Sequence, residues 1–375
     1  MKWKKRWLLP ALAALLASLT GCKHDGNGNQ TVQTASQTAA AEADGLQANQ
    51  TGHAITQEEI ANKKLTVPKA YSRFFEKSRE GAVIPALMQD YVPQGLTYLQ
   101  QKDWLIMTSY SLHKQPSLLA VVDRHSGRLV KSFFLHNQNN TAYTGHAGGV
   151  AASGAYIWIS SGSKLHALHS SKLIDGADGS RLVFEQAVPV ETNGSFVTYA
   201  DGMLWVGEFA RSNYKTKDSH KLKARDGTSY SAWVAGYKLD AQTGLIAARG
   251  KTADGALIPD SIIAIPDEIQ GMDIAGSRIF LSRSYGRNNP SHLFIHANPL
   301  QDAPHAQVTI GEVQVPLWFL DSKNLKDTFV MPPASEGIVS AAGALHILYE
   351  SGMTDMRKNG AYPVDRLRVL DLNEL

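Results

Sequence analysis

Five polar residues stand just ahead of five glycines, and each glycine opens a stretch in which apolar residues alternate with others. These polar residues are Gln94, His146, Asn193, Gln270 and Glu336. The glycines that follow them are Gly95, Gly149, Gly194, Gly271 and Gly337. A carboxylate and amide oxygens are ligands that a hard cation prefers, so Asn193, Gln270 and Glu336 are candidate calcium ligands. If all five converge they form a ligand-binding site; alternatively, polar residues simply begin the strands of a wet channel.

Acidic residues near the ends of later apolar stretches are candidates for catalysis. Glu208 and Glu350 could act as an acid/base pair if they face one pocket, and Glu336 is a third candidate. Solvated positions at the rim of the fold are the alternative for them. No serine nucleophile elbow, phosphate-binding glycine loop or cysteine–histidine pair occurs in the chain, so the residues leave open whether it is an enzyme.

Five similar segments carry these glycines, at residues 93–111, 147–163, 192–209, 268–286 and 335–352. The last two read "EIQGMDIAGSRIFLSRSYG" and "SEGIVSAAGALHILYESG". Each has an alternating run, a turn and a second apolar run, which predicts a β-hairpin. Two segments are followed by "VVDRHSGRLV" and "YKLDAQTGLI", in which an aspartate and a glycine mark the turn of an outer hairpin.

Repetition of such a unit predicts an all-β fold, a β-propeller of four-stranded antiparallel blades. We expect five blades, with a sixth, degenerate one between residues 293 and 320 as the alternative to that number. A β-sandwich with similar hairpins is the alternative fold. Residues 365–372 predict a C-terminal strand, and residues 81–87 could be its N-terminal neighbour in a blade that closes the ring.

The N-terminus predicts export. Residues 1–21 combine a basic head with a short apolar stretch and read as a signal peptide. Their end, "LTGC", resembles the bacterial lipobox, which implies that Cys22, the only cysteine, is acylated, for instance by palmitate. Residues 22–62 then form a disordered, lipidated tether, and residues 63–375 the propeller.

These features predict a monomer in the cell envelope, held through lipid on Cys22, in the outer membrane and facing the periplasm or the cell surface. The formal charge of +3 includes four basic signal residues, which leaves 3 − 4 = −1 from Cys22 onward. A chain without excess positive charge is not expected to bind nucleic acid.

Two short motifs resemble known propeller families. "VPQGLTY" at 92–98 is similar to the first-blade signature of the glutamine cyclotransferases, which are five-bladed propellers, and "VVDRHSGRLVKSF" resembles quinoprotein-like propellers. The resemblance implies a site role for Gln94. That family has an acidic YES-type segment on the second strand of the same blade, where this chain reads "MTSYS"; its own "YES" is at 349–351.

Two kinds of function follow from these observations. The first is a binding or assembly module of the envelope, whose rim binds a small ligand, a peptide or an envelope protein. The alternative is a metal-assisted enzyme, cyclotransferase-like or lactonase-like, with its site at the channel mouth. That site would be centred on Gln94, Asn193, Gln270 and Glu336.

Overall fold

The structure is a computed structural model that describes residues 54–60 and 65–375. The expected signal peptide, Cys22 and most of the expected tether lie outside the described residues. Strands dominate the described part, and its helices are all short. The α-helices are α1 (Ser72–Lys77), α2 (Ser170–Asp175) and α3 (Thr354–Asn359). The 3-10 helices are η1 (Lys69–Tyr71), η2 (Leu87–Gln89), η3 (Gln100–Lys102), η4 (Asp218–His220) and η5 (Leu372–Glu374). None of the described helices has the length and apolarity needed to span a membrane.

The first predicted hairpin begins a sheet whose strands follow the order of the sequence. Its strands are β2 (Tyr91–Leu99), β3 (Trp104–Ser111), β4 (Leu118–Asp123), β5 (Leu129–His136) and β8 (Ser180–Val183). The first four are antiparallel, and β8 joins β5 in parallel. The turn between β4 and β5 forms as expected, because the Ser126 amide donates to Asp123 Oδ1 at 2.7 Å and Gly127 has φ +70°.

The second and third hairpins share one eight-stranded sheet. Its strands, in spatial order, are β18 (Ala306–Ile310), β19 (Val313–Phe319), β14 (Ser261–Ile265), β13 (Ala232–Lys238), β10 (Met203–Glu208), β9 (Gln186–Ala200), β7 (Tyr156–His169) and β6 (Gly149–Ala152). The two hairpins merge because β7 and β9 are long. The first half of β7 pairs with β6, its second half pairs with the first half of β9, and the second half of β9 pairs with β10.

In this sheet the structure differs from two expectations that we drew from the sequence. The second aspartate–glycine turn forms at Asp240 and Gly244, but the residues after it make only an isolated bridge, and β14 takes the place beside β13. Residues 293–320 do not form a sheet of their own. The hairpin β18–β19 instead extends the edge of the eight-stranded sheet, with β19 parallel to β14.

The last two predicted hairpins each begin a four-stranded sheet. One contains β15 (Ile269–Ala275), β16 (Arg278–Arg283), β17 (Ser291–Ala297) and β20 (Leu325–Met331). The other contains β21 (Ser335–Ala341), β22 (Ala344–Tyr349), β23 (Arg366–Asp371) and β1 (Ser78–Val83). Here the N-terminal strand β1 pairs with the C-terminal strand β23, close to the pairing expected from residues 81–87 and 365–372. A separate short hairpin consists of β11 (Leu222–Lys223) and β12 (Ser229–Tyr230).

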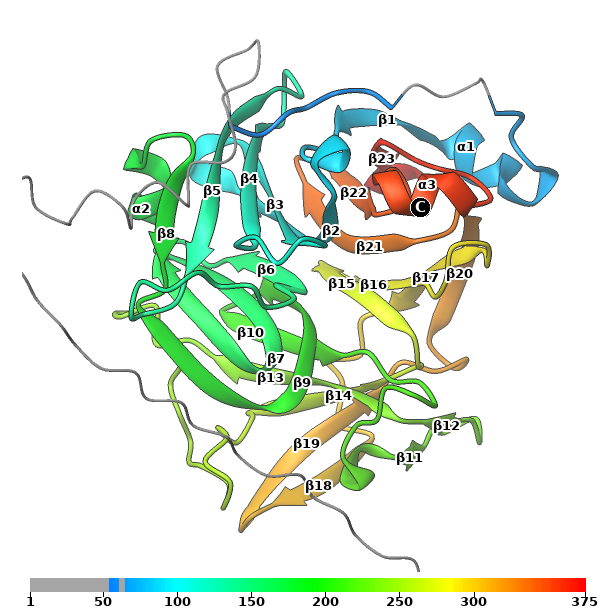
Figure 1. Ribbon diagram of the computed structural model, residues 1–375. Coiled ribbons are helices and arrows are strands. Elements are labelled where there is room, and N and C mark those ends of the chain that lie inside the picture. Colours follow the sequence, from blue (N-terminus) through cyan, green and yellow to red (C-terminus); the bar gives the residue numbers. More distant parts are fainter. Residues whose placement is uncertain (1–53, 61–64) are drawn as a thin grey trace, which may run out of the picture. The chain divides into compact units, whose positions relative to one another are not determined.

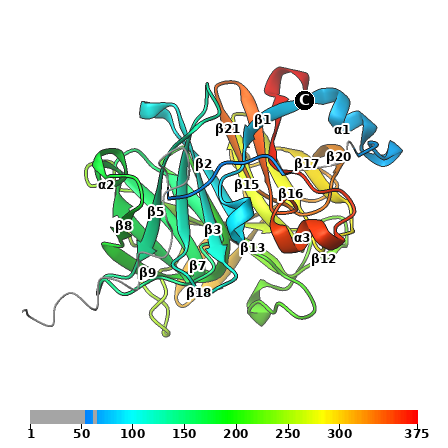
Figure 2. The ribbon, with the colours of Figure 1, turned by 45° about the horizontal axis from the view of Figure 1, so that its top comes forward.

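The first strands of the five hairpins lie around a common axis (Figures 1 and 2). In turn, β2 contacts β6, β6 contacts β9, β9 contacts β15, β15 contacts β21, and β21 contacts β2. Glycine makes these contacts possible, because a Cβ on Gly95 would lie 2.6 Å from the Val150 nitrogen. A Cβ on Gly337 would lie 2.6 Å from the Leu96 nitrogen. The fold is therefore an all-β, propeller-like arrangement, and two stacked sheets of a sandwich would not produce it.

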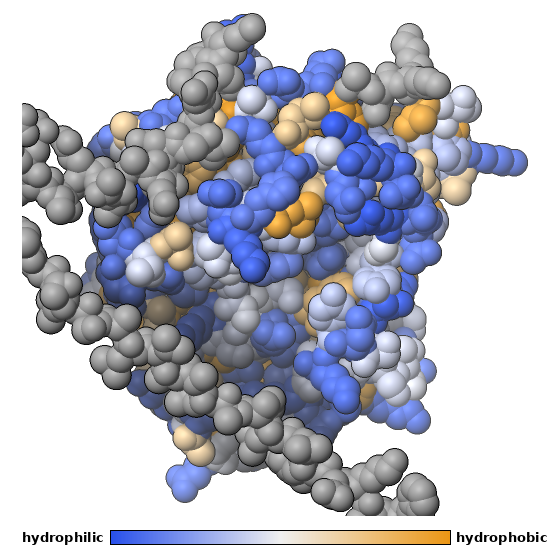
Figure 3. All heavy atoms as spheres, viewed as in Figure 1, coloured by the Kyte–Doolittle hydropathy of each residue, from blue (hydrophilic) through white to orange (hydrophobic). Residues whose placement is uncertain are grey.

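The core lies between neighbouring sheets. Leu105 and Met107 of β3, for example, belong to the same buried cluster as Leu345 and Ile347 of β22. Burying one such aliphatic side chain contributes about 1.5–3 kcal/mol. The surface shown in Figure 3 is mostly hydrophilic, with scattered apolar residues.

Residues 54–60, which precede the expected start of the propeller at residue 63, contact the sheets. Ile55 and Ile60 are buried, although we assigned them to the tether. The side chain of Gln57 donates through Nε2 to the carbonyl oxygens of Val83 and Gly127, at 2.8 and 2.7 Å. These apolar and hydrogen-bonding contacts attach residues 54–60 to the sheets.

Candidate functional site

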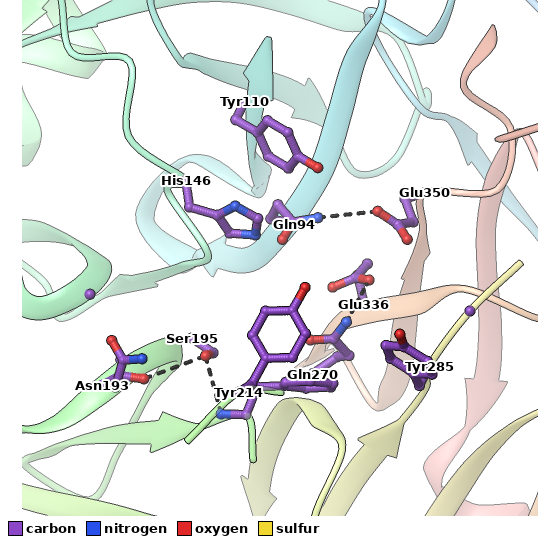
Figure 4. Close-up of a pocket in the computed structure, with 14 residues that line it drawn as sticks. Gln94, Tyr110, His146, Asn193, Ser195, Tyr214, Gln270, Tyr285, Glu336 and Glu350 are labelled. Carbon is purple, nitrogen blue, oxygen red and sulfur yellow. Dashed lines mark hydrogen bonds between the residues drawn. The ribbon is translucent and has the colours of Figure 1, made fainter. Parts of the chain in front are cut away.

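A pocket of about 350 Å³ lies where the five first strands begin (Figure 4). Its lining includes all five residues predicted to bind a ligand, of which Glu336 is also an acidic candidate, and a second acidic candidate, Glu350. These residues are Gln94, His146, Asn193, Gln270, Glu336 and Glu350. The convergence follows from the register, because in β2, β15 and β21 the polar residue directly precedes the glycine that packs at the axis. In β9, Phe196 and Val197 lie at the axis in place of Gly194.

The same register divides the axis into three levels. In β2, Gln94 lines the pocket, Gly95 and Leu96 lie at a constriction of about 10 Å³, and Thr97 lines a second pocket of about 560 Å³. The strand β21 repeats this order with Glu336 at the first level. Glycines and apolar side chains therefore separate the two ends of the channel.

Glu336, which is buried, and Glu350, which is half-buried, supply two carboxyl groups to the pocket. Gln270 Nε2 donates to Glu336 Oε1 at 3.0 Å, and Gln94 Nε2 donates to Glu350 Oε2 at 3.4 Å (Figure 4). Burial, and then the charge of Glu350, raise the pKa of Glu336 well above its usual value. Burial also raises the pKa of Glu350 to about 7, against the opposing effects of Arg287 and Gln94. Both shifts favour the protonated forms, so the pair can accept and donate a proton closer to neutral pH than exposed carboxyl groups can.

The contact between Gln94 and Glu350 joins the two motifs that the sequence separates. Gln94 belongs to the first hairpin, and Glu350 follows β22 of the last one. They meet because β21 lies beside β2. The first hairpin contributes a further residue, Tyr110 of β3, which belongs to the segment "MTSYS". Tyr110 lines the pocket, and burial, followed by the charges of Glu350 and Glu336, raises its pKa to about 12.

Aromatic residues form much of the remaining wall, and the sequence patterns did not single them out. They are Tyr110, Phe209, Tyr214 and Tyr285. Tyr110 stacks on His146 with a centroid distance of 4.5 Å. Phe209 and Tyr285 closely follow second strands, so their position after the hairpin was the available signal.

Tyr285 is held from outside the pocket by a cation. The Arg211 guanidinium lies 3.3 Å from the centre of the Tyr285 ring, and Arg211 Nε donates to Glu268 Oε1 at 3.0 Å. This arrangement combines a cation–π contact with an ion pair. It fixes the orientation of the tyrosine while Arg211 itself stays out of the pocket lining.

Glu208 does not line this pocket, so the expected pair of Glu208 and Glu350 does not form. Its side chain is 1% exposed and accepts hydrogen bonds from the backbone nitrogens of Asn193 and Trp233, at 3.0 and 3.1 Å. The bond from Asn193 goes to Glu208 Oε1 and the bond from Trp233 to Oε2, and His220 Nδ1 also lies 2.8 Å from Oε2. These bonds occupy the carboxylate, which holds Asn193 in place from behind the wall.

The polar side chains of the pocket, as they are oriented, do not present the oxygen atoms that calcium requires. Calcium takes oxygen ligands, whereas Gln94 and Gln270 turn their amide nitrogens toward the two carboxyl groups. The Gln270 amide would have to rotate for Asn193, Gln270 and Glu336 to hold the ion, and the Gln94 amide would have to rotate as well if it were a fourth ligand. Among the described residues, no group of three or more His, Cys, Asp or Glu side chains is placed to hold a metal. A calcium site remains a prediction.

Fold and pocket together define a propeller-like protein with a carboxyl pair at one end of its channel. No family model matches the chain, and no curated protein matches it. Several solved structures are similar. They are the glutaminyl cyclase of Myxococcus xanthus (12% identity, TM-score 0.37, covering 78% of this chain and 93% of that chain), the GH43_1 enzyme from Xanthomonas citri complexed with xylose (10%, 0.41, 81% and 93%) and the Dos1 propeller (10%, 0.27, 74% and 57%). At these identities and TM-scores, the similarity says nothing about the chemistry of the pocket.

Proposed function

We propose that this protein is an enzyme that binds a small amine-bearing molecule in the pocket and transfers protons through Glu336 and Glu350. The observation that carries this proposal is the carboxyl pair in the pocket, with one amide donor bonded to each member. Two carboxyl groups that share a proton supply a base and an acid in one site. Gln94 and Gln270 orient the two groups.

The lining favours a ligand with a positive charge. Of the described residues that line the pocket, none is Lys or Arg, while two are glutamates and four are Phe or Tyr. Aromatic faces attract an ammonium group, and a singly ionised carboxyl pair adds to that attraction. An anionic ligand would be repelled by an ionised carboxyl group in the pocket.

The two motifs at Gln94 and Glu350 favour a cyclotransferase-type reaction. In such a reaction, the amine of the substrate attacks an amide carbonyl of the same molecule, a new C–N bond forms, and ammonia leaves as the old C–N bond breaks. One carboxylate would accept the proton from the amine. The other carboxyl group would donate a proton to the leaving nitrogen. The lactonase-like, calcium-assisted alternative requires the amide rotations described above.

The surrounding architecture is part of the proposal. We interpret the five first strands as five blades, with the eight-stranded sheet counted as two blades joined through β7 and β9. Cys22 would carry the lipid that holds the domain in the cell envelope, at the outer membrane. A monomer would suffice, because one chain supplies every residue of the pocket.

A binding module is the second candidate, with a small ligand, a peptide or an envelope protein at the rim. It is favoured by the two amide donors, since each already occupies one carboxyl oxygen. Such a module would bind amines without converting them. Crosslinking in cells would then trap a partner at the pocket.

The test uses the purified full chain and a set of short peptides with N-terminal glutamine. Release of ammonia and the matching mass loss are measured for the wild type and for Glu336→Gln and Glu350→Gln, with Glu374→Gln, an exposed carboxylate, as control. We expect turnover in the wild type and the control alone, while circular dichroism shows all four folded. Amine binding without turnover would support the binding module, and loss of activity on chelation would support the metal-assisted enzyme. The absence of both turnover and amine binding would refute the proposal.

A further inference from the structure

A second cluster of ionisable side chains lies behind the pocket wall, and the proposed chemistry does not use it. It consists of the buried residues Glu191, Glu208, His220 and Trp233 together with the partly exposed Lys217, and we call it the His220 cluster. His220 is 0% exposed, and Glu191 and Glu208 are buried with it. Burying several charges at one place requires that they compensate one another.

The histidine lies between the two carboxylates. Its Nδ1 is 2.8 Å from Glu208 Oε2, and its Nε2 is 3.7 Å from Glu191 Oε1. The ring stacks on Trp233 with a centroid distance of 3.9 Å and an interplanar angle of 16°. Lys217 Nζ lies 2.8 Å from Glu191 Oε1. His220 Nε2 and Glu191 Oε2 are buried, and neither has a hydrogen-bond partner among the described residues.

The charges balance only when His220 is protonated. With a neutral imidazole, two carboxylates face a single ammonium group, and a net negative charge stays buried. An imidazolium brings the sum to zero and presents N–H groups to both carboxylates. Burial lowers the pKa of His220, but the nearby carboxylates of Glu191 and Glu208, the latter within hydrogen-bond distance, outweigh burial and raise the pKa overall.

The neighbouring elements add few other ionisable groups. The Tyr237 hydroxyl of β13 accepts a hydrogen bond from the Glu191 nitrogen at 2.9 Å. Asp254 lies 3.5 Å from Lys217 Nζ and is exposed. The titration of His220 is therefore governed mainly by Glu191 of β9, Glu208 of β10 and Lys217 of its own segment.

His220 belongs to the segment that covers part of the pocket. Residues 209–231 connect β10 to β13, and both Phe209 and Tyr214 of this segment line the pocket. The Phe209 nitrogen donates to Ser195 Oγ at 3.1 Å, and Phe209 contacts Tyr214 edge-on with a centroid distance of 5.3 Å. η4, which carries His220, is the part of this segment that enters the buried cluster.

We infer that the imidazolium of His220, held between Glu191 and Glu208, fastens residues 210–221 to the sheets and so positions Tyr214 at the pocket, and that loss of its proton releases these residues. The later part of the segment is attached separately, through Arg225 to Asp321 and through Tyr230 to the Leu320 carbonyl oxygen.

His220 is thus a positioning residue and not a catalytic one. The pKa of His220 is higher in the folded state than in the unfolded state. The stabilisation is therefore complete below the pKa of the unfolded state, and it is lost as pH rises through the pKa of the folded state. The fastening is independent of the proposed function, and only its effect on ligand binding rests on that function.

Limited proteolysis of the full chain tests the fastening without any ligand. Trypsin can cleave residues 210–221 at Lys215, Lys217 and Lys221. The cleavage rate of His220→Gln is divided by that of the wild type at pH 6 and at pH 9, so that the pH dependence of trypsin itself cancels. His125→Gln, a substitution at an exposed histidine, is the matched control.

We expect the ratio for His220→Gln to be about tenfold or more at pH 6, as for loss of a charge-assisted hydrogen bond, and to approach one at pH 9. The control ratio should be one at both values. If the ratio of cleavage rates for His220→Gln is the same at pH 6 and at pH 9, the inference is overturned, whether that ratio is large or equal to one.

A second variant covers the case in which His220→Gln does not fold. Glu191→Gln leaves His220 with one carboxylate, so cleavage should accelerate at a lower pH than in the wild type. An unchanged pH midpoint in that variant would equally overturn the inference. Neither result bears on whether Glu336 and Glu350 turn over a substrate.

Discussion

Replacement of Glu350 by glutamine should change how the free energy of unfolding depends on pH. Burial raises the pKa of Glu350 from 4.5 to about 7, a difference of about 2.5 pH units. At about 1.36 kcal/mol for each pH unit, this corresponds to about 3 kcal/mol. The folded state binds this proton more tightly than the unfolded state, so the stability that Glu350 contributes is complete below pH 4.5 and is lost as pH rises through 7. An uncharged amide of the same shape avoids that loss. Glu350→Gln should therefore match the wild type near pH 4 and exceed it by about 3 kcal/mol near pH 8.

Urea unfolding followed by tryptophan fluorescence measures this difference directly. Wild type and Glu350→Gln are compared at pH 4, 6 and 8, with Glu374→Gln as control because its side chain is 54% exposed. The control should show no difference from the wild type that grows between pH 4 and pH 8. A constant gap between Glu350→Gln and the wild type would refute the reasoning, because it would mean that Glu350 ionises in the folded state as it does in water.

Three further outcomes are expected. Gly337→Ala should lower the free energy of unfolding by about 1–3 kcal/mol in the same urea assay, since the new Cβ would lie 2.6 Å from the Leu96 nitrogen; an unchanged value would contradict the close approach at the axis. Cys22→Ser should abolish palmitate labelling and shift the chain from the membrane to the soluble fraction, and persistent membrane binding would contradict the anchor. Burial lowers the pKa of His346 to about 4, so stability should fall as pH drops from 6.5 toward 4, and His346→Gln should flatten that part of the curve; an equal slope would show that His346 is not the cause.

Local patterns in the sequence were sufficient for much of the fold. The alternation of apolar residues around a turn predicts each hairpin, and the hairpins at residues 93–111 and 335–352 form as β2–β3 and β21–β22. The aspartate turn after β4 also forms as predicted. These features depend on residues close together in the chain, so the sequence reports them directly.

The grouping of strands into sheets could not be predicted from the sequence to the same extent. Nothing local indicates that β7 and β9 are long enough to join two hairpins, or that β19 lies parallel to β14. The burial of Ile55 and Ile60 against the sheets was missed for the same reason. Each of these outcomes depends on partners far away in the chain, which compete for the same edge or surface.

The sequence by itself determined which residues begin the first strands, because a polar residue close ahead of a glycine is repeated five times and needs no knowledge of the fold. Only the tertiary structure decided which acids share a pocket: Glu350 reaches Gln94 across neighbouring sheets, while Glu208 turns away to bind backbone nitrogens and His220. The physical reason is that a repeated pattern specifies position along a strand, whereas the direction and ionisation of a carboxyl group depend on burial and on neighbours that only the folded chain brings together.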